Sequence, residues 1–215
     1  EGAPNLPGMG QYIAIPTGAK ATVKITAQRI ESYKNINLAP APRIPLDTED
    51  GPMDYSKNNM LYNTNAFYPA EPVKLSEVSS IRGVESVILG ITPYQYNPVT
   101  RELIVYRDLQ IDVEFEGGQG TFGEDRLRSR WFDPILSDMM INYSSLPKVD
   151  YDARAASYTK DTDGCEYLVI TPTAQEFQNW ADSVRVFRNH QGILTKVMTI
   201  EEIGGNNTTA METFF

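Results

Sequence analysis

Residues 94–103 read YQYNPVTREL, and this stretch decides how the first part of the chain folds. Apolar runs stand on both sides of it, VESVILGIT before and IVYRDLQIDVEF after. Asn97 and Pro98 are typical of the first two positions of a type I turn. The pattern therefore predicts a β-hairpin with aromatic side chains near its tip. We expect these aromatic residues to pack across the strands rather than to bind a ligand; they are Tyr94, Tyr96 and Tyr106.

Alternation of apolar and polar residues extends the strand pattern beyond the hairpin. Apolar side chains occupy every second position of residues 109–115, and within the strand pattern of residues 11–30 Val23, Ile25 and Ala27 form one predicted face. A period of two means that one face of each strand is buried and the other is wet. Turn residues at 16–19 separate the first two predicted strands. After a glycine-rich break at 117–123, apolar residues at helical spacing predict one or two helical turns within residues 131–147, covering an edge of the sheet.

The segment 38–72 has a different composition, with prolines at 40, 42, 45, 52, 69 and 72. Each proline removes a backbone donor, so continuous strand pairing is not expected here. Long irregular segments inside a compact domain are usually functional or disordered. Aromatic residues within it predict that the segment can dock on another surface.

Residues 165–215 show a second pattern, which predicts strand, helix, strand and the start of another helix. Thr173 and Glu176 have the spacing of a capping box, and Gly192 is a predicted helix end. The predicted helix carries one apolar face, formed by Phe177, Trp180, Ala181, Val184 and Phe187. A right-handed crossover would make the two strands parallel. Because two strands and one helix cannot complete a core, we expect an incomplete β-α-β piece of a larger α/β domain.

Composition excludes several classes of protein. The net charge of −9 argues against partners with a phosphate backbone and against anionic membranes. No apolar run reaches 18 residues, so no membrane insertion is expected. A single cysteine, Cys165, allows no internal disulfide and no cysteine-rich metal site, and no cofactor or metal is expected. Cys165 and His190 fall at the wrong edge of the predicted strands for a catalytic dyad, so no catalytic residue is assigned.

Several motifs resemble one known family. The hairpin ILGITPYQYNPVTRELIVYRDLQIDVEF is similar to the prodomain of gingipain-type secreted cysteine endopeptidases, caspase-like enzymes of Bacteroidetes. The segments NLAPAP and FYPAEP resemble further parts of that prodomain, and YTKDTDGCEYLVIT resembles the start of the mature enzyme. The resemblance implies a mainly β fold: an antiparallel β-sandwich prodomain at 1–147, a linker and processing segment at 148–164, and the start of an α/β peptidase domain at 165–215.

The resemblance also implies a function, namely a prodomain that assists folding and keeps the enzyme latent by inserting the proline-rich loop 40–72 into the active-site cleft. Counting without gaps places Asp47 at the position of the inhibitory basic residue, and Arg43 is the nearest basic candidate. Activation by a processing protease is expected near Arg154 or Lys148. The family's catalytic Cys and His would lie beyond residue 215 and further strands before residue 1, so this chain is not expected to cleave peptides.

The implied partner is the chain's own catalytic domain, and the implied location is secreted or at the cell surface, after export through the periplasm of a Bacteroidetes-type bacterium. A second hypothesis comes from the scattered aromatic residues, which also suit a secreted β-sandwich adhesion or carbohydrate-binding module. Inhibition of the mature peptidase and binding to glycans distinguish the two.

Overall fold

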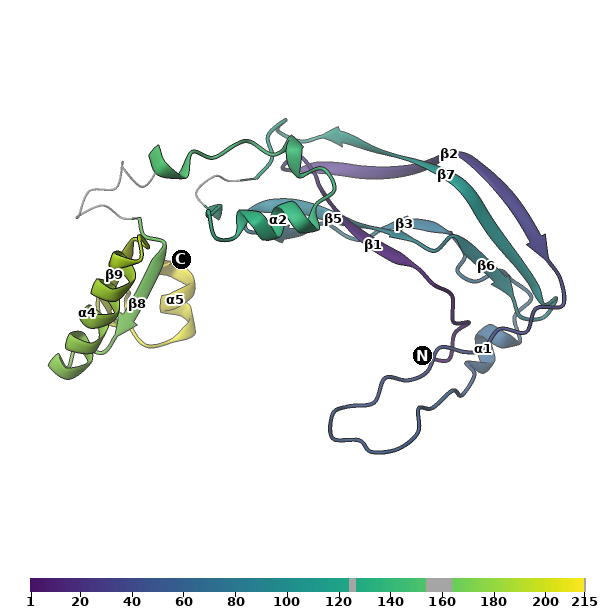
Figure 1. The fold of residues 1–215 in the computed structure, drawn as a ribbon, viewed down its shortest axis with the longest axis horizontal. Coiled ribbons are helices and arrows are strands. Elements are labelled where there is room, and N and C mark those ends of the chain that lie inside the picture. The colour runs from purple at the N-terminus through teal and green to yellow at the C-terminus, as the bar shows by residue number, and fades with distance from the viewer. Residues whose placement is uncertain (124–126, 154–163, 215) are drawn as a thin grey trace. The chain divides into compact units, whose positions relative to one another are not determined.

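The computed structural model describes residues 1–123, 127–153 and 164–214 and divides into two compact units, Glu1–Lys148 and Val149–Phe215. The first unit contains two antiparallel sheets (Figure 1). One sheet has the order β1-β5-β3, with β4 also paired to β5; its strands are β1 (Met9–Ala14), β3 (Val73–Leu75), β4 (Ser79–Ile81) and β5 (Val84–Ile91). The other has the order β2-β7-β6; its strands are β2 (Ala19–Tyr33), β6 (Tyr94–Asn97) and β7 (Glu102–Gly117).

The two sheets pack face to face, as a β-sandwich does. The buried cluster on the first sheet includes Ile13, Val87 and Leu89. Half-buried side chains of the other sheet pack against it; they are Ala21, Val23 and Ile25 of β2 and Ile111 and Val113 of β7. The expected mainly β fold with antiparallel sheets is thus confirmed.

The alternation in β2 ends earlier than the sequence pattern predicts. Ala27 was expected on the buried face beside Ile25, but it is exposed. The register between β2 and β7 shifts at Ile25/Ala27 and again at Ala27/Arg29, and Asp108 of β7 has a positive φ of 53°. A bulge adds a residue to one strand and turns the following side chains, which removes Ala27 from the core.

The predicted hairpin forms between β6 and β7, with Asn97 opposite Glu102. The side-chain oxygen of Asn97 accepts hydrogen bonds from the amides of Val99 (3.0 Å) and Thr100 (3.2 Å), which closes the turn. Arg101 completes it with a positive φ of 57°. The turn chemistry read from the sequence is therefore confirmed.

A helical segment covers one edge of the first sheet, as expected from the spacing of its apolar residues. It comprises α2 (Asp133–Met139) and the 3-10 turn η2 (Tyr143–Ser145). A second buried cluster lies beneath it; its members are Ala14, Val84, Leu136, Met140 and Leu146. The Asn142 side chain accepts a hydrogen bond from the Ala14 amide and donates one to the Ala14 carbonyl, each at 2.8 Å. These two bonds satisfy backbone groups at the edge of β1.

The second unit contains β8 (Tyr167–Thr171), α4 (Gln175–His190), β9 (Thr195–Thr199) and α5 (Thr208–Phe214). The strands β8 and β9 are parallel, as predicted. The predicted capping box is wrong: Ala174 precedes the first turn of α4, and no side chain caps it. Thr173 instead donates its hydroxyl to the carboxylate of Glu201 (3.2 Å). On the apolar face of α4, Ala181 is buried, whereas Trp180 is 75% exposed.

Candidate functional site

The candidate site is a projecting loop, residues 42–57, which extends away from both sheets of the first unit in Figure 1. It is the first half of the proline-rich segment, and none of its residues is buried. The second half, residues 58–72, contains the short helix α1 (Asn59–Tyr62) and returns to the sandwich. The irregular backbone expected over 38–72 is confirmed, but the segment divides into a projecting half and a docked half.

Both ends of the projecting loop are held by one residue, Gly2. The Gly2 amide donates to the Ala41 carbonyl (2.9 Å), and the Gly2 carbonyl accepts from the Asn58 amide (2.9 Å). The Ala41 amide also donates to the Ala3 carbonyl at 2.7 Å. The N-terminal segment thus joins the two sides of the loop at its root.

Only glycine fits at this root. Gly2 has a φ of +66°, in the left-handed region that side chains disfavour. A Cβ atom there would lie 2.7 Å from the Asn58 nitrogen and 2.8 Å from the Ser56 carbonyl oxygen. The sequence offered no signal for this role, because Gly2 and the backbone groups that it joins are far apart along the chain.

Arg43 lies in the stem of the projecting loop. Its amide donates to the Asp54 carbonyl (3.0 Å), which pairs the outgoing and returning sides of the loop. Its guanidinium forms an ion pair with Glu49 at 2.7 Å. The Arg43 hydrogen bond and the Leu46 amide together lower the pKa of the exposed Glu49 carboxyl below its ordinary value. Arg43 therefore braces the loop from within.

Asp47 lies at the tip of the loop. The Glu49 amide donates to the Leu46 carbonyl (2.9 Å), which forms a tight turn with Asp47 and Thr48 in its middle. The Glu49 carboxylate also accepts from the Leu46 amide at 3.0 Å, so the turn is closed on both sides. Asp47 is exposed. Among the contacts of the described residues, none joins its carboxylate to a partner.

Large apolar side chains are exposed along the loop, although nothing in the sandwich covers them. The exposed fractions are 82% for Ile44, 67% for Leu46, 53% for Met53 and 54% for Tyr55. Clustered exposed apolar groups on a soluble domain mark a surface that contacts something else.

The docked half is fixed to the hairpin that the sequence predicted. Tyr68 and Tyr96 exchange two backbone hydrogen bonds of 2.9 and 2.8 Å. The Gln95 amide group donates to the carbonyls of Pro69 (2.8 Å) and Ala70 (2.9 Å). Tyr96 itself is 2% exposed, and its hydroxyl donates to the Ile36 carbonyl (2.9 Å). The aromatic residues of the hairpin thus pack and anchor the chain on both sides of the loop.

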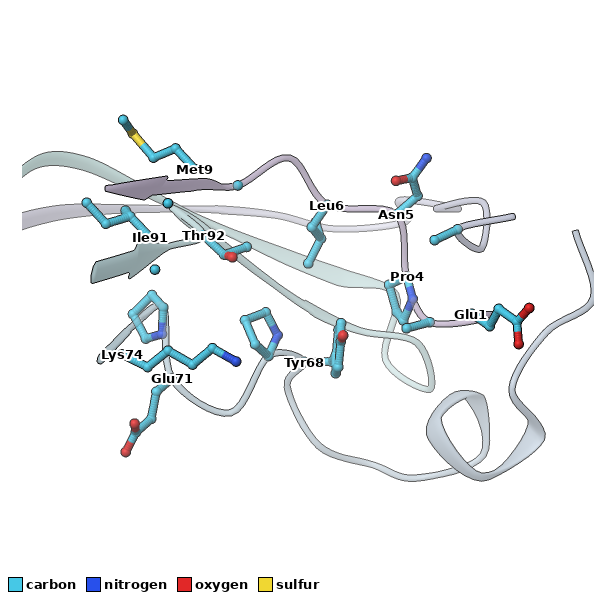
Figure 2. A pocket seen from close by; sticks show the side chains of 17 residues that line it. Glu1, Pro4, Asn5, Leu6, Met9, Tyr68, Glu71, Lys74, Ile91 and Thr92 are labelled. Atoms are coloured by element: carbon cyan, nitrogen blue, oxygen red, sulfur yellow. The ribbon is translucent and has the colours of Figure 1, made fainter. Parts of the chain in front are cut away.

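A groove of about 410 Å³ lies beside the docked half. Figure 2 shows that its wall comes from the N-terminal segment (Pro4, Leu6), the docked half (Tyr68) and the end of β5 with the residue that follows it (Ile91, Thr92). A smaller pocket of about 250 Å³ lies at the root of the loop, between Gly2, Arg43 and Asn58. Neither groove brings together the side chains of a catalytic centre.

One of the two processing candidates, Lys148, lies where the first unit ends. Leu146 is buried, and the Pro147 carbonyl accepts a hydrogen bond from Arg128 (3.2 Å). Arg128 and Asp133 form a buried pair with two hydrogen bonds of 2.7 Å. Lys148 follows directly and is exposed. The second candidate, Arg154, lies outside the described residues.

Cys165 lacks the environment of a catalytic nucleophile. Burial raises the pKa of its thiol, and the nearby Lys196 offsets this only in part. A raised pKa keeps the thiol protonated at neutral pH, and the thiol is a poorer nucleophile than the thiolate.

Membrane-spanning helices and metal centres are two further features to consider in the described part of the chain. None of its helices combines the length and the apolar character that crossing a membrane requires. His, Cys, Asp and Glu side chains at residues 1–123, 127–153 and 164–214 nowhere gather in threes as a metal ion would need.

The first unit is a sandwich that buries its own cores and holds an ordered, exposed loop clear of both sheets, which marks the loop as a contact surface. The comparisons supply the class of protein. The chain belongs to the family Propeptide_C25, which matches residues 1–149, and it contains the prodomain of a gingipain-type peptidase precursor.

Gingipain R1 of Porphyromonas gingivalis is 24% identical over 207 residues, which cover 94% of this chain and 20% of that protein. Lys-gingipain HG66 of the same organism is 26% identical over 141 residues, or 63% of this chain and 8% of that protein. This chain therefore spans about a fifth of the length of Gingipain R1. The solved complex of Porphyromonas gingivalis RgpB pro- and mature domains shares the fold, with a TM-score of 0.58 and 24% identity over 67% of this chain and 74% of that one.

Proposed function

We propose that residues 1–148 keep a cysteine endopeptidase latent by placing the projecting loop in its active-site cleft, and that they assist its folding. The observation that carries this proposal is the state of residues 42–57. They are exposed, rooted at both ends and braced inside, yet they contribute nothing to the cores of the sandwich.

This construction suits an inhibitor. A loop that is ordered before binding loses little conformational entropy when it binds, so more of the contact energy appears as affinity. The backbone pairing at Gly2 and at Arg43 provides that order. The exposed Ile44 and Leu46 provide apolar surface for the walls of a cleft.

The proposed partner is the catalytic domain of the same precursor. Gingipain R1 matches 94% of this chain, so the match continues past the prodomain into residues 165–215. By analogy with the gingipains, the location is secreted or at the cell surface, reached through the periplasm. Processing would fall in residues 148–164, between the anchored Pro147 and the β8 strand.

Lys148 and Arg154 are the proposed processing positions. Proteases cut exposed and poorly anchored backbone, and Lys148 is the first exposed residue after the Arg128 contact. Replacing both residues by Gln in the full precursor is expected to slow maturation, as followed by gel mobility. The matched control is Lys20→Gln, which changes an exposed lysine within β2. Unchanged maturation of the double variant would place processing elsewhere.

The central test mixes this 215-residue chain with the mature peptidase of the same precursor. We expect tight inhibition that substrate competes with, and we expect loss of binding when a covalent inhibitor already fills the active site. Binding that is indifferent to the covalent inhibitor would contradict insertion into the cleft. Absence of inhibition, together with measurable glycan binding, would favour the carbohydrate-binding alternative.

A further inference from the structure

We infer that the parent peptidase cleaves after an acidic residue, with Asp47 as the inhibitory side chain that occupies its specificity pocket. This inference rests on the proposed insertion of the loop. It adds the substrate class: extended peptides with an apolar residue followed by Asp.

The first argument is the position of the two candidate side chains. Asp47 is at the tip, within the turn from Leu46 to Glu49. Arg43 is in the stem, where its amide pairs with the Asp54 carbonyl. A cleft that receives the projecting loop meets the tip first, and presenting Arg43 would require opening the stem.

The second argument is the bonding of the two side chains. The Arg43 guanidinium is paired with Glu49 at 2.7 Å and lies 3.9 Å from Glu1. Exposed ion pairs are weak, about 0.2–1 kcal/mol, so this pair alone would not withhold Arg43 from a pocket. The hydrogen bond from the Arg43 amide to the Asp54 carbonyl fixes Arg43 in the stem. The ion pair then orients its guanidinium toward Glu49, within the loop. The Asp47 carboxylate has no such competing contact among the described residues.

The third argument concerns the neighbouring acidic residues. Presenting Glu49 would break the hydrogen bond by which its carboxylate closes the turn on the Leu46 amide, in addition to its weak ion pair with Arg43, so Glu49 is less available than Asp47. Asp50 is exposed like Asp47 but lies outside the turn. Leu46 immediately precedes Asp47 and is 67% exposed, so an apolar side chain accompanies the carboxylate at the tip.

The chemistry of the receiving pocket follows from the carboxylate. A desolvated carboxylate requires charge-assisted hydrogen bonds, so the pocket must carry Arg or Lys. In a substrate with Asp at this position, the peptide C–N bond after Asp breaks. One water supplies the hydroxyl of the new carboxylate and the proton of the released amine.

Two experiments test the inference. The mature peptidase is assayed with matched peptides that contain Pro-Leu-Asp, Pro-Leu-Asn, Pro-Leu-Arg or Pro-Leu-Lys before the scissile bond. We expect kcat/KM for Asp to exceed that for Asn by about tenfold to a hundredfold, the range that a hydrogen bond to a charged group provides. Cleavage after Arg or Lys in preference to Asp would overturn the inference.

The second experiment measures inhibition by variants of the 215-residue chain. Asp47→Asn is expected to raise the inhibition constant by a similar factor, whereas the control Asp50→Asn is expected to change it less than about threefold. If the unchanged chain inhibits but Asp47→Asn inhibits equally well, the substrate assignment is wrong and the proposed latency stands. If the unchanged chain does not inhibit at all, the proposed latency itself is wrong. The peptide assay then decides the specificity independently.

Discussion

Both halves of the proline-rich segment contain prolines, but residues 42–57 carry six charged side chains and residues 58–72 carry one, and the two halves have opposite roles. Residues 58–72 return to the sandwich, where β6 holds them through Tyr68, Pro69 and Ala70. Residues 42–57 bond chiefly within themselves and to the N-terminal segment. Prolines exclude regular strand pairing in both halves. Contacts with other segments decide the rest: residues 58–72 dock because β6 bonds to them, and residues 42–57 project because they bond chiefly to one another and to the N-terminal segment. Changes in the body or the docked half should therefore alter stability, and changes at the tip should alter inhibition.

The largest expected effect on stability comes from the body of the first unit. Asp133→Asn is expected to lower the unfolding free energy by about 3–5 kcal/mol, because it leaves the buried Arg128 with a broken ion pair. Urea denaturation can follow Trp131 fluorescence in a Trp180→Phe background. The control Asp138→Asn, on the exposed side of the same helix, should stay within about 0.5 kcal/mol. Equal stability of the two variants would contradict the buried pair.

The root of the projecting loop gives the next effect. Gly2→Ala is expected to cost about 1–3 kcal/mol locally, since it combines a positive φ with a Cβ atom 2.7 Å from the Asn58 nitrogen. The measurement is limited trypsin digestion at Arg43 and Lys57, which should become faster. In the control Gly90→Ala, the added Cβ meets nothing closer than 3.6 Å. An unchanged digestion rate for Gly2→Ala would show that Gly2 does not hold the root.

A matched pair of tyrosines compares the two halves directly. Tyr96→Phe is expected to cost about 1 kcal/mol, because the Ile36 carbonyl loses its buried donor. Tyr55→Phe makes the same change in the projecting loop, where the hydroxyl donates to the Met53 sulfur at 3.8 Å. It should leave stability unchanged within about 0.5 kcal/mol. The measurement is again the midpoint of urea denaturation. Similar losses of stability for both variants would contradict the proposed difference between the hairpin that anchors the docked half and the projecting loop.

The smallest effect is a pH dependence of the loop. Arg43 and the Leu46 amide lower the pKa of Glu49, so the folded loop is stabilised wherever Glu49 is ionised. This contribution is present above the ordinary pKa of a glutamate and is lost as the pH falls through the lowered value. Hydrogen exchange of the Leu46 amide should keep its protection down to that acidic range. Arg43→Gln should raise the pH at which the Leu46 amide loses its protection. An unchanged pH profile of protection would contradict the stabilising role of the Arg43–Glu49 ion pair.

Sequence reasoning recovered the features that depend on neighbouring residues. The Asn97 turn, the paired strands around it and the parallel β8 and β9 all follow from local patterns. It failed where distant groups compete for the same atoms. Thr173 bonds to Glu201 instead of capping its helix, and the bulge near Asp108 removes Ala27 from the core.

The candidate site was predictable only in outline. Prolines marked the irregular segment, but the division at its middle depends on contacts with Gly2 and with β6. Those contacts join residues more than twenty positions apart, and no local pattern records them. Glu49, for example, belongs to an acidic run that the sequence does not distinguish from ordinary exposed surface, yet its carboxylate closes the turn through Arg43 and the Leu46 amide.

The most direct test of the account replaces residues 44–53 of this chain by a glycine-serine linker and measures inhibition of the mature peptidase. The account predicts a loss of inhibition of at least about a hundredfold, which corresponds to roughly 2.7 kcal/mol of binding. It also predicts an unchanged unfolding midpoint, since these residues lie outside both cores. Full inhibition by the loop-replaced chain would show that the sandwich itself, and not the projecting loop, restrains the enzyme.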